Sequence, residues 1–197
     1  MSRLTVGSIE GLTENSNVIS VPTGHSLNVA DAGALIAPGH IIQVVSTTKT
    51  DTFSASITGG STASVTGLSA TITPSSTSSK ILIMVSLNGA RNDGGAGEAD
   101  VAFQISRDGT SVGSGDAAGS RPGVVSMFDL DPASNASRGQ IYGQYLDSPA
   151  STSALTYQVE YYARATDTYY VNRSPVDSDN IVHARSQSTI TLMEVAG

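Results

Sequence analysis

The sequence predicts an all-β protein in which antiparallel strands form a sandwich, and three observations favour this class. Serine and threonine make up about a quarter of the 197 residues, and these short side chains suit strand faces and tight turns. Charged residues reach only 14%, against roughly 25% in ordinary soluble domains. Long stretches of good helix formers are missing, whereas short apolar runs alternate with Gly, Pro, Asn and Asp.

The charge balance argues against two classes of partner. The net charge is −7, the pI is about 4.7, and no cluster of Lys or Arg occurs. Nucleic-acid binding needs a basic surface that displaces phosphate counterions, and docking on anionic lipid needs basic residues too. We therefore expect no nucleic-acid partner and no membrane insertion. The absence of cysteine excludes disulfides, so stability must come from packing or oligomerisation.

We expect no targeting signal at the N-terminus. No run approaches the ~18 apolar residues of a membrane-spanning helix, and residues 1–5 lack the apolar core of a signal peptide. We expect the protein to be made in a cytoplasm and to leave the cell by lysis or as part of a particle.

Residues 1–37 are predicted to form an N-terminal β stem. Residues 22–29 (PTGHSLNV) and 38–44 (PGHIIQV) are each typical of a Pro/Gly turn that leads into a short strand. Segments so poor in apolar residues cannot bury a core alone, but they can where copies of a chain wrap round one another. We therefore expect an intertwined homotrimer. The residues predicted to make its stem contacts are Val18, Ile19, Val21, His25, Leu27 and Val29.

Residues 38–197 are predicted to form the head, which begins with a strand at residues 41–46. The Ser/Thr/Gly-rich stretch at residues 50–64 is expected to form a hairpin, and another strand is expected at residues 68–73. Residues 80–87 (KILIMVSL) are a continuous apolar run, which is typical of a central strand covered on both faces.

The second half of the head alternates strands with polar loops. Val101, Phe103 and Ile105 alternate with smaller or polar residues, as in a half-buried strand, and Asp108-Gly109 predicts a hairpin turn. The strands expected after it lie at residues 111–112, 124–130, 140–146, 155–161, 169–171 and 188–195. About nine or ten strands with regularly spaced turns predict a β-sandwich, and a jelly roll fits this count best.

Five stretches carry a resemblance to a known family. They are residues 21–25 (VPTGH), 37–48 (APGHIIQVVSTT), 67–89 (GLSATITPSSTSSKILIMVSLNG), 103–110 (FQISRDGT) and 188–197 (STITLMEVAG). In their order they resemble small tail-fibre and related virion surface proteins of tailed phages, especially cyanophage-like ones. The resemblance implies a homotrimer on a virus particle with a jelly-roll-like head.

The resemblance leaves two positions on the particle open. A tail fibre would contact the host cell surface with its head loops, whereas a capsid decoration (cement) protein would stabilise the shell at three-fold sites. Typical fibres have a long N-terminal portion that binds the tail, and this chain begins almost directly with the predicted stem. We expect the N-terminal segment to hold other virion proteins. A trimeric tail fibre is the leading hypothesis, and the short anchor keeps the decoration protein as its alternative.

The sequence has no local signature of catalysis or of a metal site. No Gly-x-Ser-x-Gly motif accompanies His25, His40 and His183, so we expect no enzyme and no cofactor. Asp-rich loops at residues 129–135 and 177–180 carry oxygen atoms that calcium accepts. They match no EF-hand and are equally typical of turns, so calcium binding stays open.

The tyrosines are the sharpest sign of a binding surface. All seven lie between Tyr142 and Tyr170, and two adjacent pairs flank one turn, so some of these rings must face opposite ways. Tyrosine suits stacking on sugar rings, although packing in the sandwich or in the trimer interface is the favoured explanation for them. If the head binds a host glycan, the predicted contacts are Tyr162, Arg164, Asp167, Tyr169 and Tyr170.

Overall fold

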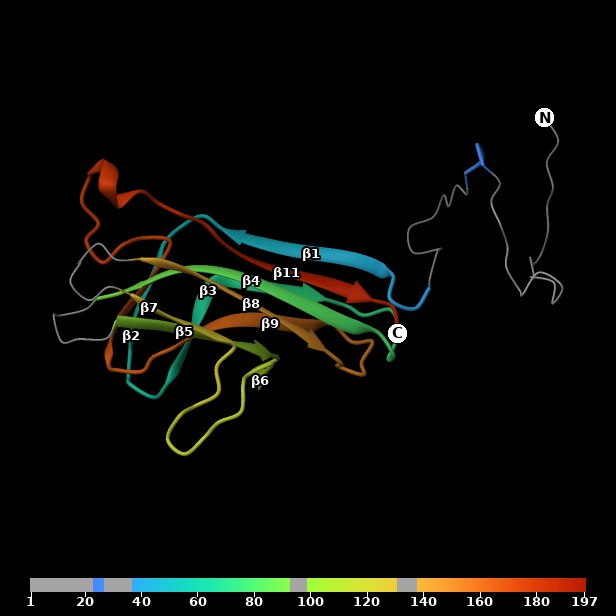
Figure 1. Cartoon of the computed structure of the whole chain (residues 1–197), viewed down its shortest axis with the longest axis horizontal. Coiled ribbons are helices and arrows are strands. Elements are labelled where there is room, and N and C mark those ends of the chain that lie inside the picture. The colour runs from blue at the N-terminus through green and yellow to red at the C-terminus, as the bar shows by residue number, and fades with distance from the viewer. Residues whose placement is uncertain (1–22, 27–36, 93–98, 131–137) are drawn as a thin grey trace. The chain divides into compact units, whose positions relative to one another are not determined.

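A computed structural model of the chain describes residues 23–26, 37–92, 99–130 and 138–197 (Figure 1). The chain divides into two units, Met1–Leu35 and Ile36–Gly197, close to the predicted joint between stem and head. Within the first unit, His25 is exposed in a turn that Gly24 enters with a φ of +85°. The other predicted stem contacts lie outside the described residues; these are Val18, Ile19, Val21, Leu27 and Val29.

The second unit is a β-sandwich of two antiparallel sheets. Sheet A consists of β1 (Ile41–Lys49), β2 (Phe53–Ile57), β4 (Lys80–Arg91), β8 (Gly139–Asp147), β10 (Asp167–Val171) and β11 (Ser188–Val195). Sheet B consists of β3 (Thr62–Ile72), β5 (Ala99–Arg107), β6 (Thr110–Val112), β7 (Ser126–Leu130) and β9 (Leu155–Tyr162). The hydrogen-bonded order is β1-β11-β4-β10-β2 in sheet A, with β8 also paired to β4. In sheet B it is β3-β9-β5-β6, with β7 also paired to β5. The predicted all-β sandwich is confirmed.

The strand pairs are nested along the chain. The outermost pair is β1 with β11, and inside it follow β2 with β10, β3 with β9, β4 with β8, and β5 with β7. All five pairs are antiparallel, and β3, β5, β7 and β9 belong to sheet B while the others belong to sheet A. The head is therefore arranged as one long antiparallel hairpin that folds over into two layers.

Alternation along the strands places one face of each sheet in a shared core. On β9, Leu155, Tyr157, Val159 and Tyr161 are buried, as the alternating pattern of the sequence predicts. The largest fully buried side chains come from both sheets: Tyr157, Tyr161, Tyr169, Phe103, Leu68, Ile72, Ile81, Ile83, Leu87, Ile105, Ile190 and Leu192. Burial of this apolar surface, at about 25 cal/mol per Å², is the main force that holds the sheets together.

Strand β4 differs from its prediction. The apolar run at residues 80–87 was expected to be covered on both faces, yet Ile83 and Val85 are buried while Met84 between them is exposed. No described residue covers the outer face of β4 here, so the prediction was wrong for this face. The hairpin expected at residues 50–64 was also wrong. This stretch holds β2, which pairs with β10 in sheet A, and the first residues of β3, which pairs with β9 in sheet B.

The chain enters and leaves the head at the same end of the sandwich. The amide of Gly39 donates to the carbonyl of Ala196 at 2.8 Å, and the amide of Ala196 donates to the backbone carbonyl of His40 at 2.8 Å. We call this the joint end. The opposite, distal end carries the β9–β10 turn and the long connection from β10 to β11 (Figure 1). The helix η2 (Ile181–His183) lies in that connection, and no helix in the described part of the chain could cross a membrane.

Candidate ligand-binding site at the distal end

The two tyrosine pairs are divided between the core and two outer faces. Tyr161 on β9 and Tyr169 on β10 both point into the core, where their ring centres lie 5.5 Å apart. Successive strand residues point to opposite sides. Tyr162 therefore projects from sheet B, and Tyr170 projects from sheet A on the opposite face of the sandwich.

The buried pair cannot contact a ligand. Tyr169 has no exposed surface, so its predicted role in glycan binding was wrong. Its hydroxyl donates to the carbonyl of Ala165 at 3.1 Å, and the Tyr161 hydroxyl donates to the carbonyl of Tyr170 at 2.8 Å. Burial raises the pKa of both hydroxyl groups, which keeps them protonated as donors.

Close packing against Gly89 fixes the position of the Tyr161 hydroxyl. A Cβ atom at Gly89 would overlap that hydroxyl and would lie 2.9 Å from Cγ1 of Val101. Glycine at this point of β4 therefore lets the tyrosine ring reach across the core to β10.

An ion-pair network ties the two sheets together beside these rings. The Arg91 guanidinium at the end of β4 lies 3.0 Å from the Asp167 carboxylate and 3.4 Å from the Asp100 carboxylate. It also lies 5.9 Å from the centre of the Tyr169 ring. Asp167 accepts a further hydrogen bond from the amide of Thr168 at 2.6 Å. Asp167 therefore pairs with Arg91 inside sheet A, while the same guanidinium reaches Asp100 of sheet B, and Asp167 does not line the cavity described next.

Tyr162 and Arg164 come together at a surface cavity of about 450 Å³ on the outer side of sheet B. The nearly buried Asp100 carboxylate forms an ion pair with Arg164 at 3.7 Å, and this contact orients the Arg164 guanidinium over the cavity. The full lining is Asp100, Ala102, Ser120, Arg121, Pro122, Val124, Met127, Tyr162 and Arg164. The volume falls in the range of about 300 to 1,000 Å³ that is typical of small-ligand sites. An aromatic ring, two guanidinium groups and a carboxylate can together stack on a sugar ring and bond its hydroxyls.

Half of this cavity comes from a loop that sequence reasoning did not connect with Tyr162. Residues 118 and 121 form a two-way backbone bridge, with hydrogen bonds of 3.0 and 3.1 Å, so the chain turns back over β5. Gly119 has a φ of +62° in this turn. The Nε2 atom of Gln104 donates to the carbonyl of Gly123 at 2.7 Å and fastens the loop to sheet B. Only the glycines at 113–123 signalled this loop in the sequence.

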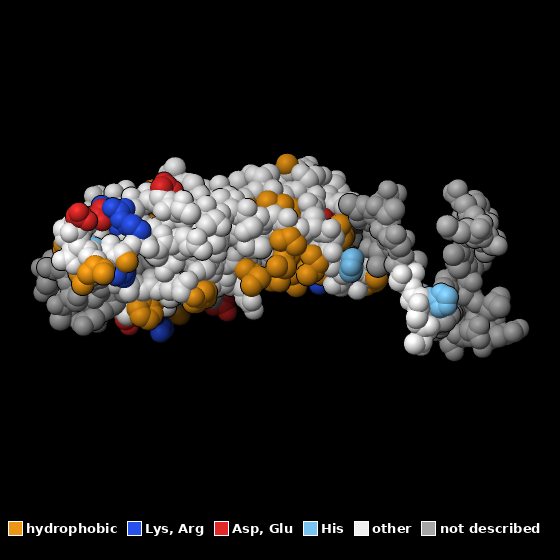
Figure 2. All heavy atoms as spheres, turned by 90° about the horizontal axis from the view of Figure 1, so that it is seen from above, with side chains coloured by type: hydrophobic (Ala, Val, Ile, Leu, Met, Phe, Trp, Pro, Cys, Tyr) orange, Lys and Arg blue, Asp and Glu red, His pale blue; other side chains and the backbone are white. Residues whose placement is uncertain are grey.

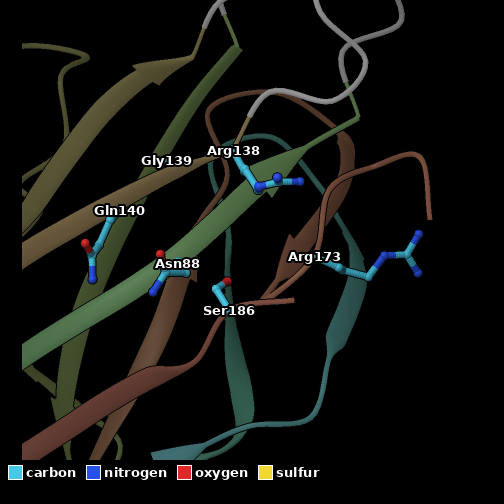
Figure 3. Close-up of a pocket in the computed structure, with 6 residues that line it drawn as sticks. All are labelled: Asn88, Arg138, Gly139, Gln140, Arg173 and Ser186. Atoms are coloured by element: carbon cyan, nitrogen blue, oxygen red, sulfur yellow. The ribbon is translucent and has the colours of Figure 1, made fainter. Parts of the chain in front are cut away.

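A second hollow, of about 220 Å³, lies where β4 ends and β8 begins (Figure 3). It is lined by Asn88, Arg138, Gly139, Gln140, Arg173 and Ser186. Gln140 donates to the Ser86 hydroxyl at 2.8 Å, and Arg138 donates to the carbonyl of Val182 at 2.9 Å. The Arg173 guanidinium points away from the other lining side chains (Figure 3) and stacks on the Tyr170 ring at 4.7 Å. Tyr170 therefore lies beside Arg173 on the outer side of sheet A, apart from the Tyr162 cavity.

The Asp-rich loop at residues 177–180 faces arginines. The Asp177 carboxylate lies 2.8 Å from Arg185 and 3.5 Å from Arg173, and Asn180 caps η2 by accepting from the amide of Val182 at 3.1 Å. Among the described residues, no group of three or more His, Cys, Asp or Glu side chains could hold a metal ion. Most of the other Asp-rich loop, including Asp131, lies outside the described residues.

No protein-family model matches the chain, and no curated protein matches it in sequence. The function is therefore argued from the geometry of the head together with the resemblance given above.

Proposed function

We propose that the protein is a structural protein of a virus particle, a trimeric phage tail fibre whose head contacts the host cell surface. In this proposal the nested strand pairs form a jelly roll, because strands paired first with last and divided between two sheets define that fold. Jelly rolls occur in viral capsid proteins and in lectins, so this fold suits a role on a virus particle.

The polarity of the head is the observation that carries the proposal. Residues 37–40 enter beside the C-terminus at the joint end, while the β9–β10 turn lies at the distal end (Figure 1). The cavity residues Tyr162 and Arg164 lie where that turn begins. A fibre needs this separation, since one end is tethered to the particle and the other must reach the cell. We therefore propose a binding role for the distal end of the head.

The proposed ligand is a neutral or acidic glycan of the host surface, held at Tyr162 and Arg164. Tyr162 offers its ring face to a sugar, and Arg164 offers donors to hydroxyl or carboxylate oxygens. Asp100 supports this role because it fixes Arg164 from below and is itself almost inaccessible.

Immunogold labelling of virus particles from the cells that make the protein tests the proposed location. Label in few copies at the tail is the expected result. Label spread over the shell would favour the capsid decoration protein, and particles without label would overturn both.

Adsorption measurements test the role of the cavity. Particles that carry Tyr162→Ala or Arg164→Ala should adsorb at least tenfold more slowly than wild type. Ile181→Ala is the control, because Ile181 is 93% exposed in η2 and belongs neither to the cavity nor to the strands of sheet A. Equal adsorption of all particles would contradict a glycan site at Tyr162.

A further inference from the structure

Four neighbouring strands of sheet A present an apolar outer face. The register places Val44 on β1, Met193 on β11, Leu82 on β4 and Leu146 on β8 in one row across the sheet. The most exposed side chains of this face are Ile41 (49%), Val44 (55%), Met84 (42%), Tyr142 (63%) and Leu146 (46%). Viewed from the side of β1 and β11, hydrophobic side chains gather in one cluster (Figure 2). We call these five residues and their row the sheet A face.

The sheet A face carries almost no charge. Between the apolar residues, its outward positions are neutral and polar: Ser46, Thr48, Ser86, Gln144, Thr189 and Thr191. Lys80 at the joint end is the only charged residue among the outward positions of these four strands. The acidic side chains Asp147 and Glu194 of the same strands are buried.

This distribution of charge favours a second copy of the chain as the occupant. Each copy carries a net charge of −7, so two copies repel one another wherever their acidic surfaces meet. A face without carboxylates is where like-charged copies approach at least cost. Its content of Tyr and Met is also typical of the centre of protein interfaces, where Lys, Glu and Asp are depleted.

The area of the face also fits association. Its five most exposed side chains leave roughly 500 Å² of largely apolar surface in water, near the upper end for the largest patch of a monomer. A standard interface buries about 800 Å² per partner, and the surrounding Ser, Thr and Gln side chains can supply the remainder. The face also begins at residues 37–41, where the chain joins the N-terminal segment.

We propose that the sheet A face is the contact between heads of neighbouring copies in the homo-oligomer. The inference deepens the proposed function by assigning a face to the proposed homotrimer, and it does not depend on a tail or a shell location. Three heads joined through this face would leave the Tyr162 cavity of sheet B open to a ligand.

Two matched substitutions in the full chain test the proposal. Met84→Glu places a carboxylate in the centre of the sheet A face, and Met127→Glu places one on β7 of sheet B, where Met127 is 56% exposed. Light scattering after gel filtration should show the mass of Met84→Glu fall about threefold from wild type, with an unchanged circular dichroism spectrum. Met127→Glu should keep the wild-type mass.

A second variant on the same face shows whether a loss of mass in Met84→Glu comes from the face or from misfolding of that one variant. Leu146→Glu lies on a different strand of the same face and should dissociate the oligomer as Met84→Glu does. A wild-type oligomer whose mass neither variant changes would overturn the sheet A face and leave the homotrimer to another contact. A wild-type monomer at micromolar concentration would overturn the face and the proposed homotrimer together, whereas the glycan site would still be tested by adsorption.

Discussion

The outer faces of the two sheets are built differently, although both belong to antiparallel strands with a buried inner side. On sheet B, polar side chains bond one another, as in Thr71 with Thr156 at 2.9 Å and Ser106 with Glu160 at 2.8 Å. Part of that face is also covered by the chain's own loop through Gln104. Sheet A also has polar pairs on its outer side, such as Ser46 with Thr191 at 2.9 Å, but its most exposed side chains are apolar, and no described residue covers them. The head therefore covers part of one outer face with its own loop and leaves the other exposed.

The loop over sheet B gives the largest expected effect on stability. A Cβ atom at Gly123 would overlap the carbonyl oxygen of Gly115, so Gly123→Ala must push the two halves of the loop apart. Overpacking of this kind costs about 2 kcal/mol, and urea denaturation measures it. Gly115→Ala is the control, because its Cβ would meet only the Val124 carbonyl, at 3.8 Å. Equal free energies of unfolding for both variants would contradict the tight contact.

The second largest effect is expected for a glutamine of sheet B, whose removal should destabilise the fold more than removal of a glutamine on sheet A. The Gln158 amide on sheet B donates to the carbonyls of Val65 at 2.9 Å and Leu68 at 3.1 Å, within the irregular part of β3. Gln158→Ala should lower the free energy of unfolding by about 1 to 2 kcal/mol, since these carbonyls lose their donor. Gln144→Ala on the sheet A face should change it by less than about 0.5 kcal/mol. Equal shifts of the urea midpoint for the two variants would contradict a structural role for Gln158 that Gln144 lacks.

The joint end of the sandwich should respond to pH, because Glu194 lies near the end of β11 there. Burial alone would raise the pKa of Glu194, but hydrogen bonds from Ser75 and Gln43 together lower it below the usual 4.5. Because the folded pKa is lowered, this stabilisation is fully present above the unfolded pKa and is lost as the pH falls through the folded value. Wild type should therefore lose more stability between pH 6 and pH 3 than Glu194→Gln. If wild type and Glu194→Gln lost the same free energy of unfolding between the two pH values, as measured by urea titration, this role of Glu194 would be contradicted.

The smallest expected effect concerns the sheet A face itself. If copies associate through it, the melting temperature of wild type should rise by about 3 °C for each tenfold increase in protein concentration. Met84→Glu should melt at one temperature at every concentration. Scanning calorimetry at two concentrations measures both, and a wild type without this dependence would count against association.

The sequence predicted the strands well wherever one side of the strand faces the core. Val101, Phe103 and Ile105 on β5 and the odd-numbered residues of β9 were placed correctly because their alternation records burial. The early start of β3 was missed, because residues 62–67 are mostly small and polar and carry little apolar signal. The run at residues 80–87 misled for a physical reason. The sequence pattern of residues 80–87 records only that both faces of the strand carry apolar side chains, and it does not record what covers the second face.

The candidate site was predictable only in part. Alternation alone allowed Tyr162 and Arg164 to be proposed as outward residues near a turn. The burial of Tyr169 and the engagement of Asp167 by Arg91 depend on how β10 packs beside β4, which no local pattern records. Asp100 and Arg121 join the site through the pairing of β5 with β9 and the return of the glycine loop.

The mass of the wild-type protein in solution tests the central claim most directly, because the stem, the sheet A face and the fibre all require association. Light scattering at micromolar concentration should give three times the 20.1 kDa of one chain. A mass of 20.1 kDa that stays constant on concentration would contradict the account and leave the head as a free domain with its own ligand.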